Sequence, residues 1–95
     1  MAKNADSLPA TVQEAVRLLQ GLVPEEEQSR IAMMKQDDLT SLHFGLGQWI
    51  RNSLGLWQED STLLAATGQS HPDDGSAVIV TALWCRLRED LPRVH

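Results

Sequence analysis

Apolar residues recur at intervals of three and four along almost the whole chain, and prolines and glycines interrupt this pattern. The spacing places the apolar side chains on one face of each helix. Breaks fall at Pro24, Gly55 and Gly68, since a helix rarely continues into a proline and glycine commonly ends one. With 95 residues, of which 42% are hydrophobic, the chain can bury one modest core without metals or disulfides. The sequence therefore predicts an all-α protein, a compact single-domain bundle of four to five short helices.

Two helices are predicted in the first third of the chain. The first opens at residues 7–9 and runs to about residue 23, with Pro9 in its first turn, where the missing N–H of proline is not needed. The second spans residues 24–35 and opens with three glutamates, which the positive end of the helix dipole favours. The same triplet also fits an acidic binding patch. The residues expected to face inward are Leu8, Val12, Ala15, Val16, Leu19, Leu22, Val23, Ile31, Ala32 and Met34.

A third helix is predicted over residues 38–54, with Asp37 or Asp38 as its cap. Gly45 and Gly47 lie inside it, and each costs about 1 kcal/mol relative to alanine. Such a cost suggests close approach by another helix or by a ligand, or else a kink. The apolar positions of this helix are Leu39, Leu42, Leu46, Trp49, Ile50 and Leu54.

Two further helices are predicted in the second half of the chain. A short one covers residues 62–67, capped by Ser61 and ended by a glycine. The last covers residues 77–89. Its residues 78–80 favour a strand by propensity alone, but its length, the two aspartates before it and its apolar spacing favour a helix. Its apolar positions are Ala77, Val80, Leu83, Trp84 and Leu87.

The three tryptophans are expected to lie wholly or partly in the core. Trp49 and Trp84 fall on the apolar faces of their helices. Leu56 and Trp57 follow the end of the third helix, and we expect them to fold back together as a hydrophobic anchor.

Charge and composition exclude several classes of protein. A net charge of −5 argues against a protein that coats DNA or RNA. The longest apolar stretches are far shorter than the ~20 residues that span a bilayer, and the first residues lack the apolar stretch of a secretory signal. Cys85 is the only cysteine, so it implies no disulfide, and we expect it to be buried. We therefore expect a cytoplasmic protein that binds neither membrane nor nucleic acid, with residues 1–6 disordered, 7–91 forming the helical domain and 92–95 frayed.

Enzyme and metal-site motifs are missing from the sequence. It contains no GxGxxG, phosphate loop, HExxH or GxSxG. His43, His71 and His95 do not have metal-site spacing, so we expect no metal and no cofactor. His43 could act as a base oriented by Asp73 or Asp74, but no nucleophile accompanies them. The sequence therefore predicts a protein that is not an enzyme.

His43, Gly47 and Arg51 are spaced four residues apart and share one face of the predicted third helix. A glycine between the two polar side chains leaves a shallow notch. Such a notch suits a carboxylate or phosphate, because arginine offers a bidentate fork. The alternative is structural: Arg51 pairs with Asp73 or Asp74, and His43 hydrogen-bonds a backbone carbonyl.

Two motifs resemble those of a family of small bacterial domains of unknown function. They are His43-x-x-Leu46-Gly47-x-x-Ile50-Arg51-Asn52-x-x-Gly55-Leu56-Trp57 and His71-Pro72-Asp73-Asp74-x-Ser76. The resemblance covers residues 8–87 and implies a bacterial protein, without supplying an activity. Asn52, roughly 100° around the helix from Arg51, is expected to cap a neighbouring helix or turn. The candidate ligand- or partner-binding residues are His43, Gly47, Arg51, Asn52, His71, Asp73 and Asp74.

The function that these features favour is a small acidic protein-binding module, such as an immunity-protein or antitoxin-like inhibitor of a bacterial partner. Acidic residues gather at positions 25–27, 37–38 and 59–60, and an acidic surface steers toward a basic partner. The alternative is a domain that binds a small anionic ligand through His43, Gly47 and Arg51. We also expect a homodimer, because Phe44, Leu56 and Trp57 are difficult to bury together in one small subunit.

Overall fold

All the other helices of the described residues pack against helix α5 (Pro72–Asp90). The computed structural model describes residues 8–90, and within that range all regular structure is helical. The all-α prediction is therefore confirmed, while the predicted disorder of residues 1–6 and fraying of 92–95 lie outside the described residues. The remaining elements are α1 (Val12–Leu22), α2 (Glu25–Ala32), η2 (Gln36–Leu42), η3 (His43–Gly47), α3 (Gln48–Ser53) and α4 (Thr62–Thr67).

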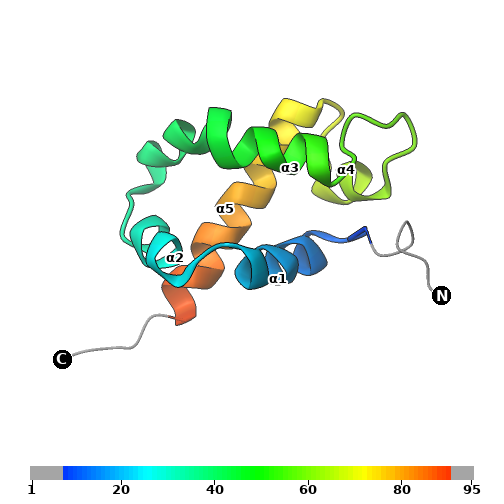
Figure 1. The fold of residues 1–95 in the computed structure, drawn as a ribbon. Coiled ribbons are helices and arrows are strands. Elements are labelled where there is room, and N and C mark those ends of the chain that lie inside the picture. Colours follow the sequence, from blue (N-terminus) through cyan, green and yellow to red (C-terminus); the bar gives the residue numbers. More distant parts are fainter. Residues whose placement is uncertain (1–7, 91–95) are drawn as a thin grey trace.

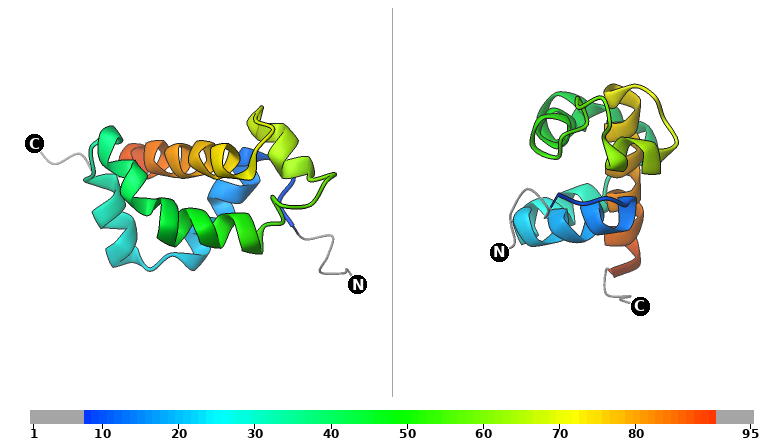
Figure 2. Two further views of the ribbon diagram at one scale, coloured as in Figure 1. Left: turned by 90° about the horizontal axis from the view of Figure 1, so that it is seen from above. Right: turned by 90° about the vertical axis from the view of Figure 1, so that its right-hand side faces the viewer.

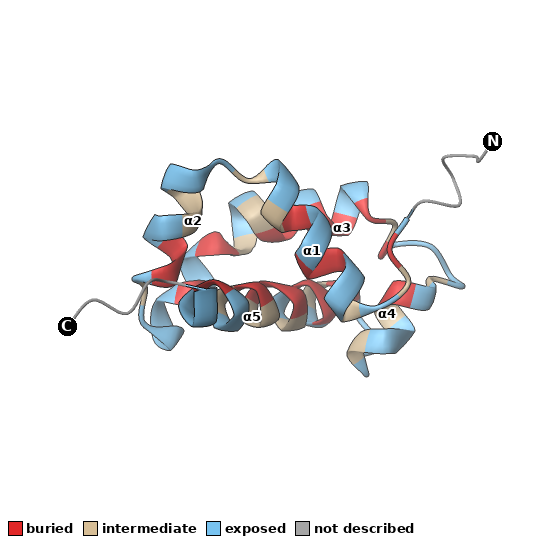
Figure 3. Ribbon diagram, turned by 90° about the horizontal axis from the view of Figure 1, so that it is seen from below, coloured by how far each residue is buried: buried red, intermediate tan, exposed pale blue. Residues whose placement is uncertain are grey.

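The helices form two groups that share α5. One group is the α1–α2 elbow, and the other is the continuous segment η2–η3–α3, as Figures 1 and 2 show. Helix α4 packs on α5 and touches α1. Buried residues line the inner side of α5 and the sides of α1 and α2 that face it (Figure 3). The core consists of Ala15, Val16, Leu19, Ile31, Ala32, Leu39, Leu42, Ile50, Leu54, Leu56, Leu63, Ile79, Val80, Leu83 and Leu87.

Helix α1 begins later than predicted. Its cap is Thr11, whose Oγ1 accepts a hydrogen bond from the Glu14 backbone N–H at 3.1 Å. The Glu14 carboxylate in turn accepts one from the Ala10 N–H at 2.9 Å. This reciprocal arrangement resembles a capping box and satisfies N–H groups that have no partner inside the helix. Leu8, expected in the apolar stripe, is instead exposed and lies before the helix.

The segment predicted as one helix over residues 38–54 changes its winding twice. It begins as the 3₁₀ helix η2, continues as the π-helix η3 and ends as α3. In η2 the hydroxyls of Thr40 and Ser41 donate to carbonyls three residues earlier, a local bond that suits tight winding. Gly45 and Gly47 both fall in η3. The departure from α-helical geometry that these two glycines predict therefore takes the form of a π-helical segment. Gly55 and Gly68 adopt positive φ and end their helices as predicted.

Helix α5 begins five residues earlier than predicted. Pro72 is its first residue, where no backbone N–H is needed. The His71 carbonyl accepts from the Gly75 N–H at 2.9 Å, and His71 Nδ1 accepts from the Asp73 N–H at 3.1 Å. His71 therefore caps the helix. The predictions for α4 hold, because Ser61 caps it by accepting from the Leu64 N–H.

The tryptophan and cysteine predictions are partly wrong. Trp84 packs against the core and donates to the Met34 carbonyl at 2.8 Å, which ties α5 to the end of α2. Trp49 and Trp57 are exposed, and Leu56 alone provides the anchor after α3. Cys85 is exposed as well, and it lies on α5 beside residues of α1 such as Val16 and Gln20.

Candidate functional site

The buried side chain of Arg51 joins α3 to the first turn of α5. Its Nε lies 3.3 Å from Asp73 Oδ1. Its Nη1 donates to Ser76 Oγ at 3.0 Å, and its Nη2 donates to the His43 carbonyl at 3.4 Å. The predicted pairing of Arg51 with Asp73 or Asp74 is therefore confirmed, with Asp73 as the partner. All three guanidinium nitrogens have partners within the chain.

Gly47 provides the space that the Arg51 guanidinium occupies. A Cβ at this position would lie 3.2 Å from Arg51 Nη1 and 3.4 Å from the Leu42 carbonyl. Gly47 itself is buried. The notch predicted between His43 and Arg51 is thus filled by the arginine of the same chain.

The other predicted site residues surround this cluster without joining it. The imidazole of His43 packs edge-to-face on Phe44, with ring centroids 4.9 Å apart, so His43 reaches Arg51 only through its carbonyl. Asn52 Oδ1 accepts from Trp57 Nε1 at 3.1 Å and therefore fixes the loop after α3. Asp74 is exposed in the first turn of α5. His71 acts as the cap described above.

Ser76 is the member of the cluster that the sequence reasoning did not select. It is buried, accepts from Arg51 and donates to the Asp73 carbonyl at 3.0 Å. In the sequence, Ser76 could have been linked to the site by its position at the end of the second motif, three residues after Asp73. That spacing puts the two residues on one face of a helix.

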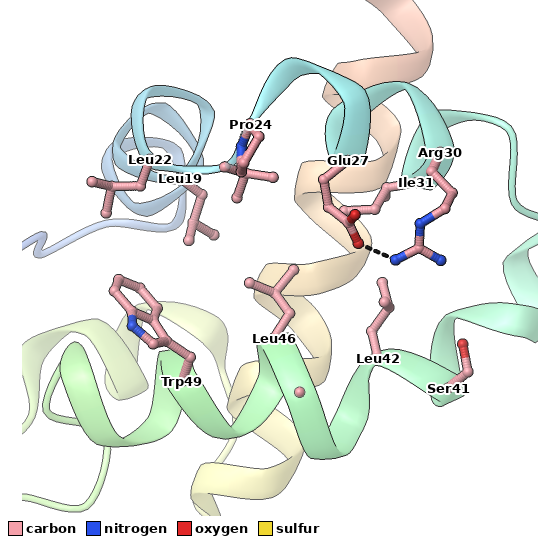
Figure 4. Close-up of a pocket in the computed structure, with 12 residues that line it drawn as sticks. Leu19, Leu22, Pro24, Glu27, Arg30, Ile31, Ser41, Leu42, Leu46 and Trp49 are labelled. Carbon is pink, nitrogen blue, oxygen red and sulfur yellow. Dashed lines mark hydrogen bonds and ion pairs between the residues drawn. The ribbon is translucent and has the colours of Figure 1, made fainter.

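A cavity lies away from the Arg51 cluster, between the α1–α2 elbow and the η3–α3 segment. It has a volume of about 600 Å³ and is mostly apolar (Figure 4). We call it the groove. Its base contains Leu19, Ile31 and Leu42, which belong to the core. On its rim Leu22 is 55% exposed and Trp49 41% exposed, so these two large apolar side chains face solvent across an open groove.

The polar groups that line the groove are engaged with the chain itself. Glu27 and Arg30 form an ion pair, whose hydrogen bond and charge raise the pKa of Arg30 above its ordinary value. The Ser41 hydroxyl donates to the Asp38 carbonyl at 2.8 Å. A smaller cavity of about 440 Å³ lies by His43 and Phe44, on another face of the same segment.

A known protein family matches most of the chain. A family described as "Domain of unknown function (DUF6794)" matches residues 8–87. The chain belongs to this family. The match covers the helical bundle almost completely, including both motifs. No curated protein and no solved structure matches the chain.

The described residues show neither a candidate metal site nor a helix that could span a membrane. In the part of the chain that the structure describes, no three histidine, cysteine, aspartate or glutamate side chains gather in a way that could hold a metal ion. Residues 8–90 also contain no helix with the length and hydropathy of a membrane span.

Proposed function

We propose that this chain is a small acidic protein-binding module that holds its partner in the groove. The observation that carries the proposal is the exposure of Leu22 and Trp49 on opposite rims of an apolar groove. Exposed apolar surface rimmed by polar residues is typical of interaction sites. Tryptophan is also among the residues that contribute most to binding energy at interfaces.

The charge of the chain supports a basic partner. The net charge is −5, and residues 24–46, which form much of the groove, carry five acidic and two basic residues. A negative potential around an apolar contact raises the association rate of a positively charged protein. Within this proposal, the chain is a cytoplasmic bacterial inhibitor that acts on a basic protein as an immunity protein or antitoxin does.

Binding of an anion by His43, Gly47 and Arg51 is the alternative function. It would need free donors on the guanidinium, and those of Arg51 contact Asp73, Ser76 and the His43 carbonyl. These contacts favour the protein-binding proposal over the alternative.

A matched pair of glycine variants tests the proposal. Gly45 lines the groove and Gly21 lies on the exposed side of α1, and a Cβ at either position meets nothing within 4 Å. Gly45→Leu fills the groove from its wall, while Gly21→Leu adds the same side chain outside it. In cross-linking from source cells, the wild type and Gly21→Leu are expected to capture the same protein, and Gly45→Leu to lose it. Capture of the same proteins by all three would contradict the proposal.

The inhibitor role is tested separately. The captured protein is expressed in a test host with and without this chain, and growth is measured. Rescue of growth by the wild type and by Gly21→Leu, but not by Gly45→Leu, is expected for an inhibitor. No effect on growth or on the partner's activity would leave binding intact and remove the inhibitor role.

A further inference from the structure

The groove offers an incoming segment almost no free hydrogen-bonding groups. Its walls are mostly helices, at the α1–α2 elbow the Gln20 and Val23 carbonyls accept from Gln28 Nε2, and residues 8–90 contain no sheet edge. Of the polar side chains that line it, Glu27 pairs with Arg30 and Ser41 donates to the Asp38 carbonyl, and only that of Trp49 makes no hydrogen bond within residues 8–90. A chain entering this groove must therefore satisfy its own backbone N–H and C=O groups, because an unpaired polar group in an apolar environment is costly.

Among peptide conformations, the α-helix satisfies these groups internally. An extended segment would leave them unpaired against Leu19, Leu46 and Trp49 (Figure 4). Small apolar molecules escape this constraint, but small-molecule sites usually bury about 70–90% of the ligand surface. The exposed Leu22 and Trp49 show that the groove is open along its rim. Its geometry is that of helix-in-groove recognition, where apolar residues at i, i+3 or i+4, and i+7 enter from the open side.

The charges beside the groove favour a bound helix whose polar face is basic. In a 3₁₀ helix residues three apart are eclipsed, so Asp38 lies on the same face of η2 as Ser41, which lines the groove. On α2, Glu26 lies one turn before Arg30, another lining residue, whose own charge is already met by Glu27. Two carboxylates are thus left beside the groove without a cation bonded to them among the described residues. A second copy of this chain would bring further negative charge to them.

Trp49 has the free donor that an interface residue needs. Within residues 8–90 its indole N–H makes no hydrogen bond, whereas those of Trp57 and Trp84 donate to Asn52 and to the Met34 carbonyl. Its ring lies on the rim of the groove opposite Leu22, with an apolar body and a polar tip.

We propose that the groove binds a basic amphipathic α-helix of the partner protein, which lays its apolar face between α1 and α3 and presents lysine or arginine to Asp38 and Glu26. This inference rests on the proposed function and names the element that the module recognises. The charge complementarity at the rim is what favours a partner helix over a second copy.

The test uses a displayed library of random 16-residue peptides selected on the 95-residue chain. Selected peptides are synthesised, and their Kd is measured for the wild type, Gly45→Leu and Gly21→Leu. We expect apolar residues with i, i+3 or i+4, i+7 spacing and an excess of lysine and arginine. We also expect at least tenfold weaker binding to Gly45→Leu alone, and a gain of helical circular dichroism on binding to the wild type.

A second groove variant and a charge pair complete the experiment. Leu22→Ser removes an exposed side chain without opening the core, and it is expected to weaken binding about fivefold or more. Asp38→Asn and Asp74→Asn each remove one carboxylate from the first turn of a helix. Only the first lies beside the groove, so it alone is expected to weaken binding, by about two- to fivefold, as does raising the salt concentration.

The outcomes separate the two proposals. Peptides that bind all variants equally, or the absence of any selected peptide, would overturn the protein-binding groove itself. Groove-dependent peptides that are acidic, or that bind without gaining helix, would overturn the helix inference and leave the proposed function standing. A wild-type dimer in sedimentation that Gly45→Leu converts to a monomer would assign the groove to a second copy and would also overturn the inference.

Discussion

Arg51 and Asp73 form an ion pair in which one side chain is buried and the other is about half exposed to solvent. The Arg51 side chain is 7% exposed and that of Asp73 is 46% exposed, with 3.3 Å between Nε and Oδ1. The cation is therefore buried between α3 and α5, while its counter-charge sits at the surface. Because a buried charge without a partner is costly, loss of Asp73 would leave the Arg51 cation inside the protein without its counter-charge.

Replacement of Arg51 is expected to destabilise the fold much more than replacement of another arginine. Arg51→Ala removes the contacts to Asp73, Ser76 and the His43 carbonyl, and we expect a loss of about 3 kcal/mol in the free energy of unfolding. Arg17→Ala, on the exposed side of α1, should cost under about 0.5 kcal/mol. Urea denaturation of both variants measures the difference. Equal losses would show that the Arg51 contacts contribute little.

The two glycines of η3 are expected to respond in opposite ways to leucine. At Gly47 the new Cβ would meet Arg51 Nη1 at 3.2 Å, and overpacking should cost about 1–3 kcal/mol. At Gly45 the Cβ meets nothing within 4 Å, and the higher helix propensity of leucine should stabilise the chain by up to about 1 kcal/mol. Thermal and urea unfolding check both values. A Gly47→Leu chain as stable as wild type would contradict the packing described for Arg51.

The hydrogen bond from Trp84 to the Met34 carbonyl is expected to hold α2 on α5. Trp84→Phe keeps an aromatic ring but removes the N–H donor, leaving a half-buried carbonyl without its partner. We expect a loss of about 1–2 kcal/mol, measured by urea denaturation. Trp57→Phe removes an exposed hydrogen bond to Asn52 and serves as the control, with a loss under about 0.5 kcal/mol. A similar small loss for both variants would argue against this role of Trp84.

Small anions are expected to leave the melting temperature unchanged. A ligand that binds only the folded state raises it, and Arg51 keeps its donors on partners within the chain. A thermal-shift screen with inorganic phosphate, nucleotides and phosphorylated metabolites makes the measurement. A rise that disappears in Arg51→Lys would instead support the alternative function.

Self-association is expected to involve Phe44, which is 81% exposed, since Leu56 is buried and cannot contribute. The Phe44 ring lies on a different face of the segment from the groove, so such a dimer leaves the groove open. Sedimentation at increasing protein concentration should show a dimer that Phe44→Ser weakens. A mass that stays at 10.5 kDa throughout would rule out this dimer.

Much of the candidate polar site was predictable because it depends on short-range spacing. His43, Gly47 and Arg51 do share one side of their segment, and an aspartate in the first turn of α5 does meet Arg51. What the spacing did not show is that Gly47 accommodates the guanidinium itself. The difference between an open notch and a filled one depends on how closely α5 approaches, since Asp73 and Ser76 of α5 hold the guanidinium in place.

The sequence alone determined the helical class, the breaks at Pro24, Gly55 and Gly68, and the cap of α4, since each depends on interactions within about four residues. The tertiary structure decided which apolar faces are covered. Leu19 and Leu22 belong to one stripe, yet the first is buried and the second exposed. The α1–α2 elbow and the η3–α3 segment both pack on α5 and lie on the two sides of the groove, which leaves Leu22 and Trp49 uncovered. Periodicity identifies an apolar face, but only the path of a distant helix determines whether anything packs against it.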